Sequence, residues 1–127
     1  MIRRLAVLLC AAAILPAAAP PAGAKSISRI GASCSAGTAG YGIKLTAGAR
    51  TTVGFGAGGA GSLGTWSVTA VDSFDGGYIL NWTGNMTTPA WTVSTTRDLP
   101  KGFHAIEITA SNATTGEVCT SGFTTKV

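Results

Sequence analysis

The sequence is poor in charge. Only 11% of its 127 residues are charged, and no two basic residues adjoin after Arg3 and Arg4. Proteins that bind nucleic acid or a membrane surface carry clustered cations on one face or one segment. The chain shows no such cluster, so we expect no nucleic-acid partner and no attachment to a membrane surface.

The sequence also lacks an apolar run long enough to cross a membrane. Leu5–Leu15 is apolar, but Pro16, Pro20 and Pro21 interrupt the stretch that follows, whereas a membrane-spanning helix needs roughly 20 apolar residues. A buried first helix is a weaker alternative, because the alanines and prolines lead directly into a polar segment. A lipid anchor on Cys10 is also weaker, because it would need a small residue before the cysteine and Leu9 stands there.

An export signal accounts for this segment better. Arg3 and Arg4 supply the positive start, Leu5–Leu15 the short apolar core, and Ala22-Gly23-Ala24 a cleavage site of small residues. We predict that residues 1–24 are a cleaved signal peptide, that residues 25–127 form one domain, and that this domain is secreted and extracellular. The abundance of Gly, Ala, Thr and Ser with little charge is typical of exported proteins of high-GC bacteria, and we expect a bacterial source.

Cysteine and histidine are scarce. Removal of the signal takes Cys10 away and leaves Cys34 and Cys119, and two cysteines allow one pairing. Because disulfides persist outside the cell, we predict a Cys34–Cys119 disulfide that ties the two ends of the domain together. Two cysteines and one histidine cannot close a tetrahedral metal site, so we expect neither a metal nor a cofactor.

No segment after the signal shows sustained helical periodicity. Apolar residues instead alternate with polar ones in short runs, such as Trp66-Ser67-Val68-Thr69-Ala70 and Tyr78–Trp82. Asp75-Gly76 and the segment 112–116 separate such runs in the manner of hairpin turns. Seven or eight short strands with turns between them predict an all-β, two-sheet antiparallel sandwich.

The last third resembles a known family. Leu99-Pro100-Lys101-Gly102-Phe103-His104-Ala105-Ile106 and the strand to Ala110 are similar to the corner and strand of bacterial immunoglobulin-like domains, and Thr115-Gly116 resembles their final turn. The resemblance covers residues 99–125 and implies an immunoglobulin-like sandwich. In that family a tyrosine ties the corner to the upstream backbone, and His104 stands in its place here.

Several residues could have a chemical role, but the surrounding sequence favours a structural role for each of them. The Gly56-x-Gly58-x-x-Gly61 pattern precedes a strand, not the helix that a dinucleotide site needs. His104 is the only histidine, and we expect it to be structural. The three Asn-x-Thr motifs at Asn81, Asn85 and Asn112 fit glycan acceptors only in a eukaryotic secretory path.

The carboxylates give two further alternatives. Glu107 and Glu117 flank the last hairpin, and a register that places Glu107 opposite residue 121 separates them by about 13 Å. That exceeds the spacing of paired-carboxylate glycosidases, so we expect both on the solvent face. Asp72 and Asp75 flank a turn but have no further acid nearby in sequence to complete a calcium site.

The aromatic residues are the remaining functional signal. Exposed rings can stack on sugars, and we single out Trp82, Trp91 and Tyr78 as ligand-binding candidates. Each tryptophan also falls in phase with apolar neighbours, so we expect at least two of the three, counting Trp66, to be buried.

The functional prediction is a small, secreted, non-enzymatic binding domain whose partner is an extracellular protein or polysaccharide. The alternative is a carbohydrate-binding module that uses its surface tryptophans. A hydrolase centred on His104 ranks below both, because nothing in the sequence marks a strained nucleophile turn.

Overall fold

The computed structural model describes residues 28–127, so the predicted signal peptide lies outside the described residues. These residues form nine β-strands and one short 3-10 helix. The elements are β1 (Ser28–Gly31), β2 (Ser33–Cys34), β3 (Ala39–Ala47), β4 (Arg50–Gly58), η1 (Ala60–Ser62), β5 (Gly64–Asp72), β6 (Tyr78–Met86), β7 (Ala90–Asp98), β8 (Phe103–Asn112) and β9 (Val118–Lys126).

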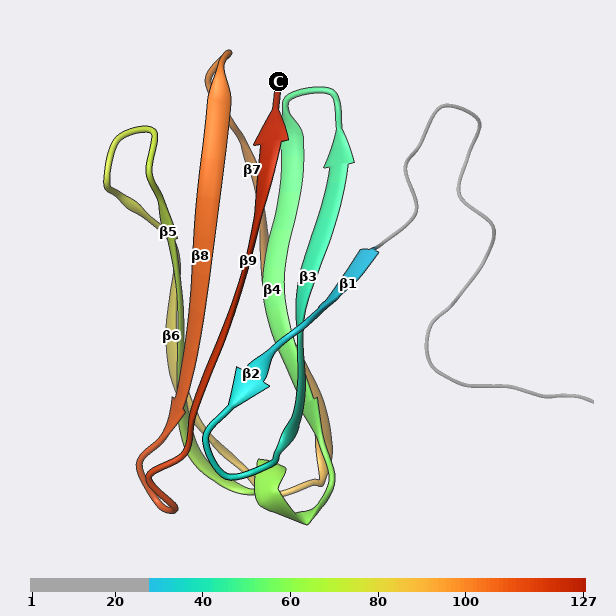
Figure 1. Ribbon diagram of the computed structural model, residues 1–127, viewed down its shortest axis with the longest axis vertical. Coiled ribbons are helices and arrows are strands. Elements are labelled where there is room, and N and C mark those ends of the chain that lie inside the picture. Colours follow the sequence, from blue (N-terminus) through green and yellow to red (C-terminus); the bar gives the residue numbers. More distant parts are fainter. Residues whose placement is uncertain (1–27) are drawn as a thin grey trace, which may run out of the picture.

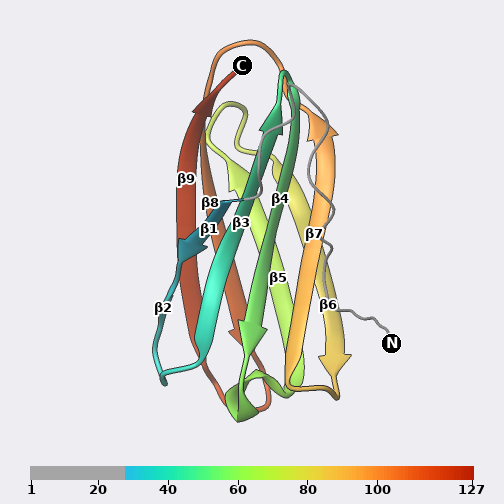
Figure 2. The ribbon, with the colours of Figure 1, turned by 90° about the vertical axis from the view of Figure 1, so that its right-hand side faces the viewer.

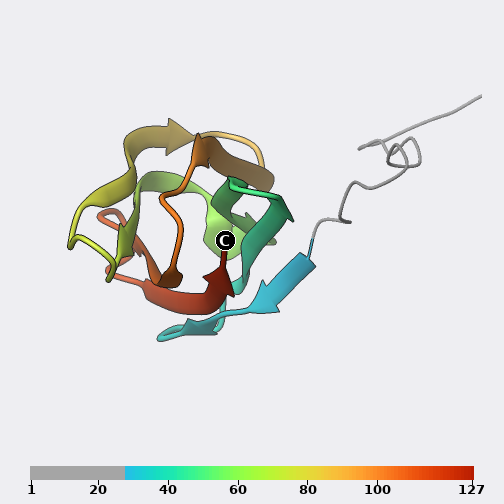
Figure 3. The same ribbon diagram turned by 90° about the horizontal axis from the view of Figure 1, so that it is seen from above.

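The strands form two antiparallel sheets, as the sequence predicts. One sheet has the order β1-β3-β4-β7 and the other the order β2-β9-β8-β5-β6 (Figures 1 and 2). Seen along the strands, the two curved layers enclose the interior between them (Figure 3). The predicted count of seven or eight strands is too low, because the N-terminal run divides at Ala32: β1 pairs with β3, and β2 pairs with β9.

The two predicted hairpin turns are confirmed. Residues 73–77 join β5 to β6, and Gly76 there has a φ of 72°, which glycine adopts without strain. Residues 113–117 join β8 to β9. The end of the sandwich at the top of Figure 1, called the upper end below, contains the turn at 48–49, the 73–77 loop, the 99–102 corner and Val127.

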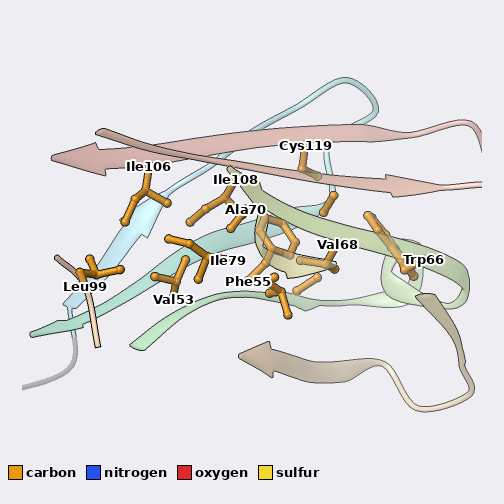
Figure 4. Packing of buried hydrophobic residues seen from close by; sticks show 13 residues of the cluster. Val53, Phe55, Trp66, Val68, Ala70, Ile79, Leu99, Ile106, Ile108 and Cys119 are labelled. Carbon is orange, nitrogen blue, oxygen red and sulfur yellow. The ribbon is translucent and has the colours of Figure 1, made fainter. Parts of the chain in front are cut away.

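The core lies between the sheets and is built from alternating inward side chains (Figure 4). Phe55, Trp66, Val68 and Ile108 are all fully buried. Trp66, Val68 and Ile108 come from strands in which buried and less buried residues alternate, whereas the inward apolar residues of β4 alternate with glycines. The cluster is completed by Val53, Ala57, Ala70, Ile79, Leu80, Leu99, Ile106, Ala110 and Cys119.

Strand β3 faces the core with its small residues. A Cβ at Gly42 would lie 2.6 Å from Ser121 Oγ of β9, so the two sheets approach closely there and only glycine fits. Its neighbour Tyr41 faces outward, where a Cβ at Gly56 would lie 2.4 Å from the tyrosine ring. Arg29 lies over the same ring at 4.7 Å. The apolar residues that alternate along β3, beginning with Tyr41, therefore lie on the outer face of its sheet.

The predicted disulfide is confirmed. Cys34 of β2 and Cys119 of β9 are directly paired neighbours in one sheet, and their sulfurs are bonded. The bond spans 85 residues and fixes the short β2 strand to the last strand. Among residues 28–127, no helix is both long and apolar enough to cross a membrane.

Candidate functional site

The three aromatic residues predicted to bind ligand do not form one row. Trp82 and Trp91 are half-buried on inner faces, whereas Tyr78 is 57% exposed on the outer face of β6. A bulge separates them: Ala70 pairs with Leu80 but Val71 pairs with Tyr78, so Ile79 is the extra residue and takes the inward position. Only Trp66 is fully buried, fewer than the two tryptophans expected.

Trp91 is held in place by the core. Its Nε1 and the Nε1 of Trp66 both donate to the carbonyl oxygen of Ser62, at 2.8 and 2.9 Å. The two rings lie 5.3 Å apart, and the ring of Phe55 lies 5.9 Å from Trp91. The indole is therefore fixed by the core and remains half-buried.

His104 forms a buried ion pair at the upper end. The side chain is fully buried, with Nδ1 2.6 Å from Asp72 Oδ2 and Nε2 2.7 Å from the carbonyl oxygen of Pro100. A carbonyl oxygen can only accept, and an ionised carboxylate can only accept. Both ring nitrogens must then donate, which requires the imidazolium form. The ring of Phe74 stacks on it at 4.6 Å.

The pKa of His104 follows from the same contacts. Burial by itself lowers it, but the hydrogen bonds to Pro100 and Asp72, with the negative charges of Asp72 and Asp75, outweigh burial and raise the pKa above 6.5. In this arrangement neither ring nitrogen is free to take a proton from a substrate. The histidine joins the 99–102 corner to the end of β5, which is a structural role.

The two aspartates that flank the 73–77 loop are engaged by that loop. Asp72 Oδ1 accepts from the backbone N–H of Phe74 at 3.0 Å, while its other oxygen faces His104. Asp75 Oδ1 accepts from Gly77 N–H at 2.9 Å. These hydrogen bonds give both carboxylates a role in the turn itself.

Glu117 is not on the solvent face, which corrects the sequence prediction. It is 3% exposed and accepts from the backbone N–H groups of Ala36 and Thr38, at 2.7 and 3.1 Å, and from the Thr38 hydroxyl. The carboxylate thus satisfies the donors of the turn between β2 and β3. Glu107 is exposed and pairs with Gly122, one residue beyond the predicted register.

The predicted glycine and asparagine motifs fall on ordinary structural positions. Gly56 and Gly58 belong to β4, Gly61 lies in η1, and β5 follows. Asn112 is 1% exposed and its amide donates to the Leu63 carbonyl oxygen, which ties the last hairpin to the start of β5. Asn81 and Asn85 are exposed on β6.

A lysine-lined cleft is the feature that sequence reasoning missed. It opens at the upper end, has a volume of about 890 Å³, and is lined by all three lysines of residues 28–127, namely Lys44, Lys101 and Lys126. They come from β3, the 99–102 corner and the end of β9, which are distant in sequence. No aspartate or glutamate of the described residues lines it. We call it the lysine cleft.

Two side chains of β3 define the inner wall of the lysine cleft. Lys44 faces inward, with its Nζ 5.2 Å from the centre of the Phe123 ring and 3.1 Å from the Thr124 carbonyl oxygen. Two residues on, Thr46 lines the cleft, and its buried hydroxyl has no hydrogen-bond partner among residues 28–127. The lysine is thereby positioned, and an unpartnered polar group lies beside it.

The cations of the cleft are not neutralised by side chains of the described part of the chain. Residues 28–127 contain the ion pairs Arg50–Asp98, at 3.3 Å, and His104–Asp72, and neither pair includes a lysine. Like charges collected in one concave site raise the local concentration of anions. Chemically, the cleft can hold a carboxylate or a phosphate.

One group of side chains has the spacing of metal ligands, but two of its members form the disulfide. The Sγ atoms of Cys34 and Cys119 and a carboxylate oxygen of Glu117 lie within 4.8 Å of one another, but the two sulfurs are bonded together.

Comparisons with protein-family models, curated proteins and solved structures returned no match for this chain.

Proposed function

We propose that this chain is an extracellular, non-enzymatic binding domain that holds an anionic ligand in the lysine cleft. The observation that carries the proposal is the convergence of Lys44, Lys101 and Lys126 on one cleft that no acidic side chain lines. The unpartnered hydroxyl of Thr46 supplies a hydrogen-bonding group at the same place.

An extracellular location is supported by the disulfide, since such bonds are rare in cytosolic proteins. The cleaved signal over residues 1–24 and the bacterial source belong to the same proposal and rest on the sequence. An immunoglobulin-like topology is supported by the two antiparallel sheets and by the corner at residues 99–102, where His104 binds Pro100 and Asp72.

An acidic polysaccharide is the ligand class we favour. The cleft volume of about 890 Å³ lies within the range of small-ligand sites, so it can take a few sugar units. Lysine binds as a point charge on a flexible stem and does not impose the planar geometry of arginine. A chain of carboxylate-bearing sugars presents charges at intervals that three separate lysines can meet.

The test is a titration of the secreted protein with oligogalacturonate and with its methyl-esterified form, which has the same backbone without the charges. We expect the acidic form to bind and the ester to bind far more weakly. Removing one exposed lysine, as in Lys101→Ala or Lys126→Ala, should weaken binding about two- to fivefold. Added salt should weaken it further.

Arg97→Ala is the matched control, because it removes an exposed cation of β7 that does not line the cleft. It should leave the affinity unchanged. Equal loss in Arg97→Ala and Lys101→Ala would show that net charge, not the cleft, attracts the ligand. Inorganic polyphosphate serves as a second anion: if it alone binds, the ligand carries phosphate and the polysaccharide assignment is wrong.

A neutral polysaccharide is the second candidate. It is favoured by the partial exposure of Trp82 and Trp91 on neighbouring edge strands, where a sugar ring could stack. This candidate predicts equal binding of the acidic and esterified chains, and no effect of the lysine substitutions.

A further inference from the structure

The two sides of the sandwich end in very different edge strands. On one side the edges are β1 and β2, of four and two residues, and the chain changes sheets between them. On the other side the edges are β6 and β7, each of nine residues. Short, interrupted edges protect a sheet from further pairing, whereas long edges invite it.

Strand β7 is the less protected of the two long edges. It pairs with β4 over nine residues without a register shift, contains no proline, and carries charge only at Arg97 and Asp98, at its end. Strand β6 has a bulge at Ile79, which bends its edge. Unpaired backbone groups along a regular strand of this length can hydrogen-bond to another strand.

Apolar side chains are left incompletely covered on the same side. Trp82 and Met86 of β6, and Trp91 and Val93 of β7, pack against the core but remain partly exposed. Figure 2 shows β6 and β7 next to each other at this side of the molecule. A partner seated along β7 would remove part of this apolar surface from water, which favours association.

We propose that β7 pairs with β7 of a second copy of this chain, antiparallel and centred on Ser94. In this register Ser94 faces Ser94 of the second copy, and Trp91 faces Arg97. Val93 faces Thr95, and Thr92 faces Thr96. The same surface serves both copies, as a two-fold dimer requires.

The positions of the charged residues on β7 favour a second copy as the occupant. The only charged residues of β7 fall opposite uncharged ones: Arg97 opposite Trp91 and Asp98 opposite Ala90. No like charges meet, and the guanidinium of Arg97 approaches an indole, a pairing that is favourable. The outward residues Thr92, Ser94 and Thr96 form opposed hydroxyl pairs, which also stabilise adjacent strands.

Sedimentation equilibrium of the secreted protein tests the dimer. The wild-type chain should dimerise reversibly. Ser94→Lys places two cations directly opposite each other and should weaken the dimer about fivefold, and Ser94→Asp should do the same with two anions. Mixing the two variants pairs opposite charges, so the mixture should associate more strongly than either variant alone. Because Ser94 is exposed, neither substitution should unfold the domain.

Thr120→Lys is the matched control, since it adds a lysine to an exposed position of β9 on the outer face of the other sheet. It should dimerise like the wild type. A wild-type chain that stays monomeric up to its solubility limit would overturn the proposal, as would a mixture of the Ser94 variants that gains nothing. A monomer whose tryptophan fluorescence responds to neutral oligosaccharides would instead assign the open side to sugar binding.

Discussion

Replacing His104 with phenylalanine tests the buried ion pair most directly. The His104→Phe side chain keeps an aromatic ring beside Phe74 but donates no hydrogen bond to Asp72, which is 4% exposed. Breaking a buried pair by removing one partner costs about 3–5 kcal/mol, because the remaining charge stays buried without compensation. Against a total stability of about 5–15 kcal/mol for a domain, this loss is large.

A second substitution separates the pair from the packing. Asp72→Leu together with His104→Phe leaves neither charge buried, and replacing both partners by apolar residues is often nearly neutral. The double variant loses the acceptor for Phe74 N–H, which costs about 1 kcal/mol. It should therefore be more stable than His104→Phe alone, by about 2–4 kcal/mol.

The pH dependence gives an independent check. The pKa of His104 is raised above 6.5 in the folded protein by its bonds to Pro100 and Asp72, which outweigh burial. The unfolded chain then binds fewer protons than the folded one at a pH just above 6.5. The contribution of His104 to stability is complete below pH 6.5 and is lost as the pH rises through the folded pKa.

The assay is urea unfolding followed by tryptophan fluorescence, since Trp66 is fully buried and becomes exposed on unfolding. The free energy of unfolding of the wild type should be higher at about pH 6 than at about pH 9, and His104→Phe should lose this difference. A wild-type stability that is constant or rises over this interval would refute the imidazolium assignment. So would a cost of His104→Phe below about 1 kcal/mol.

Two further predictions concern the chain ends. Replacing both Cys34 and Cys119 with alanine should cost about 2–4 kcal/mol in the same assay, below the entropic limit of about 4.6 kcal/mol for a loop of this length; an unchanged stability would mean that strand pairing alone holds the ends. Glu117→Gln should cost about 1–2 kcal/mol, because the amide keeps one acceptor oxygen but loses the negative charge that strengthens the hydrogen bonds to the 35–38 turn. Proteolysis at that turn should become faster, and an unchanged cleavage rate would contradict this role of Glu117.

The regular part of the fold could be predicted from local patterns. Alternation in segments such as Trp66–Ala70 identifies strands, because side chains in a strand point to opposite faces in turn. Asp75-Gly76 marks a hairpin, because its residues tolerate the backbone angles of a tight turn. The disulfide could be predicted because only Cys34 and Cys119 remain once residues 1–24 are taken as a signal peptide, and two cysteines allow one pairing. None of these inferences depends on how distant strands pair.

The features that the sequence predicted wrongly depend on how segments distant in the chain pair with one another. The bulge at Ile79 turns Tyr78 outward, although the sequence gives Tyr78, Leu80 and Trp82 the same phase. Glu117 is buried because a turn 79 residues earlier in the chain supplies its donors. The split of the N-terminal run into β1 and β2 follows from which sheet edge each half meets. Periodicity contains none of this information.

The lysine cleft begins two residues along β3 from the close approach of the sheets at Gly42. Because that residue has no side chain, β3 and β9 approach until Ser121 nearly touches its backbone. Two residues further along β3, the inward position is Lys44, whose stem reaches past Phe123 so that its ammonium group binds the Thr124 carbonyl oxygen. A lysine buries its apolar stem readily while its charge stays in water. The inward lysine therefore marks where the core ends and the cleft begins.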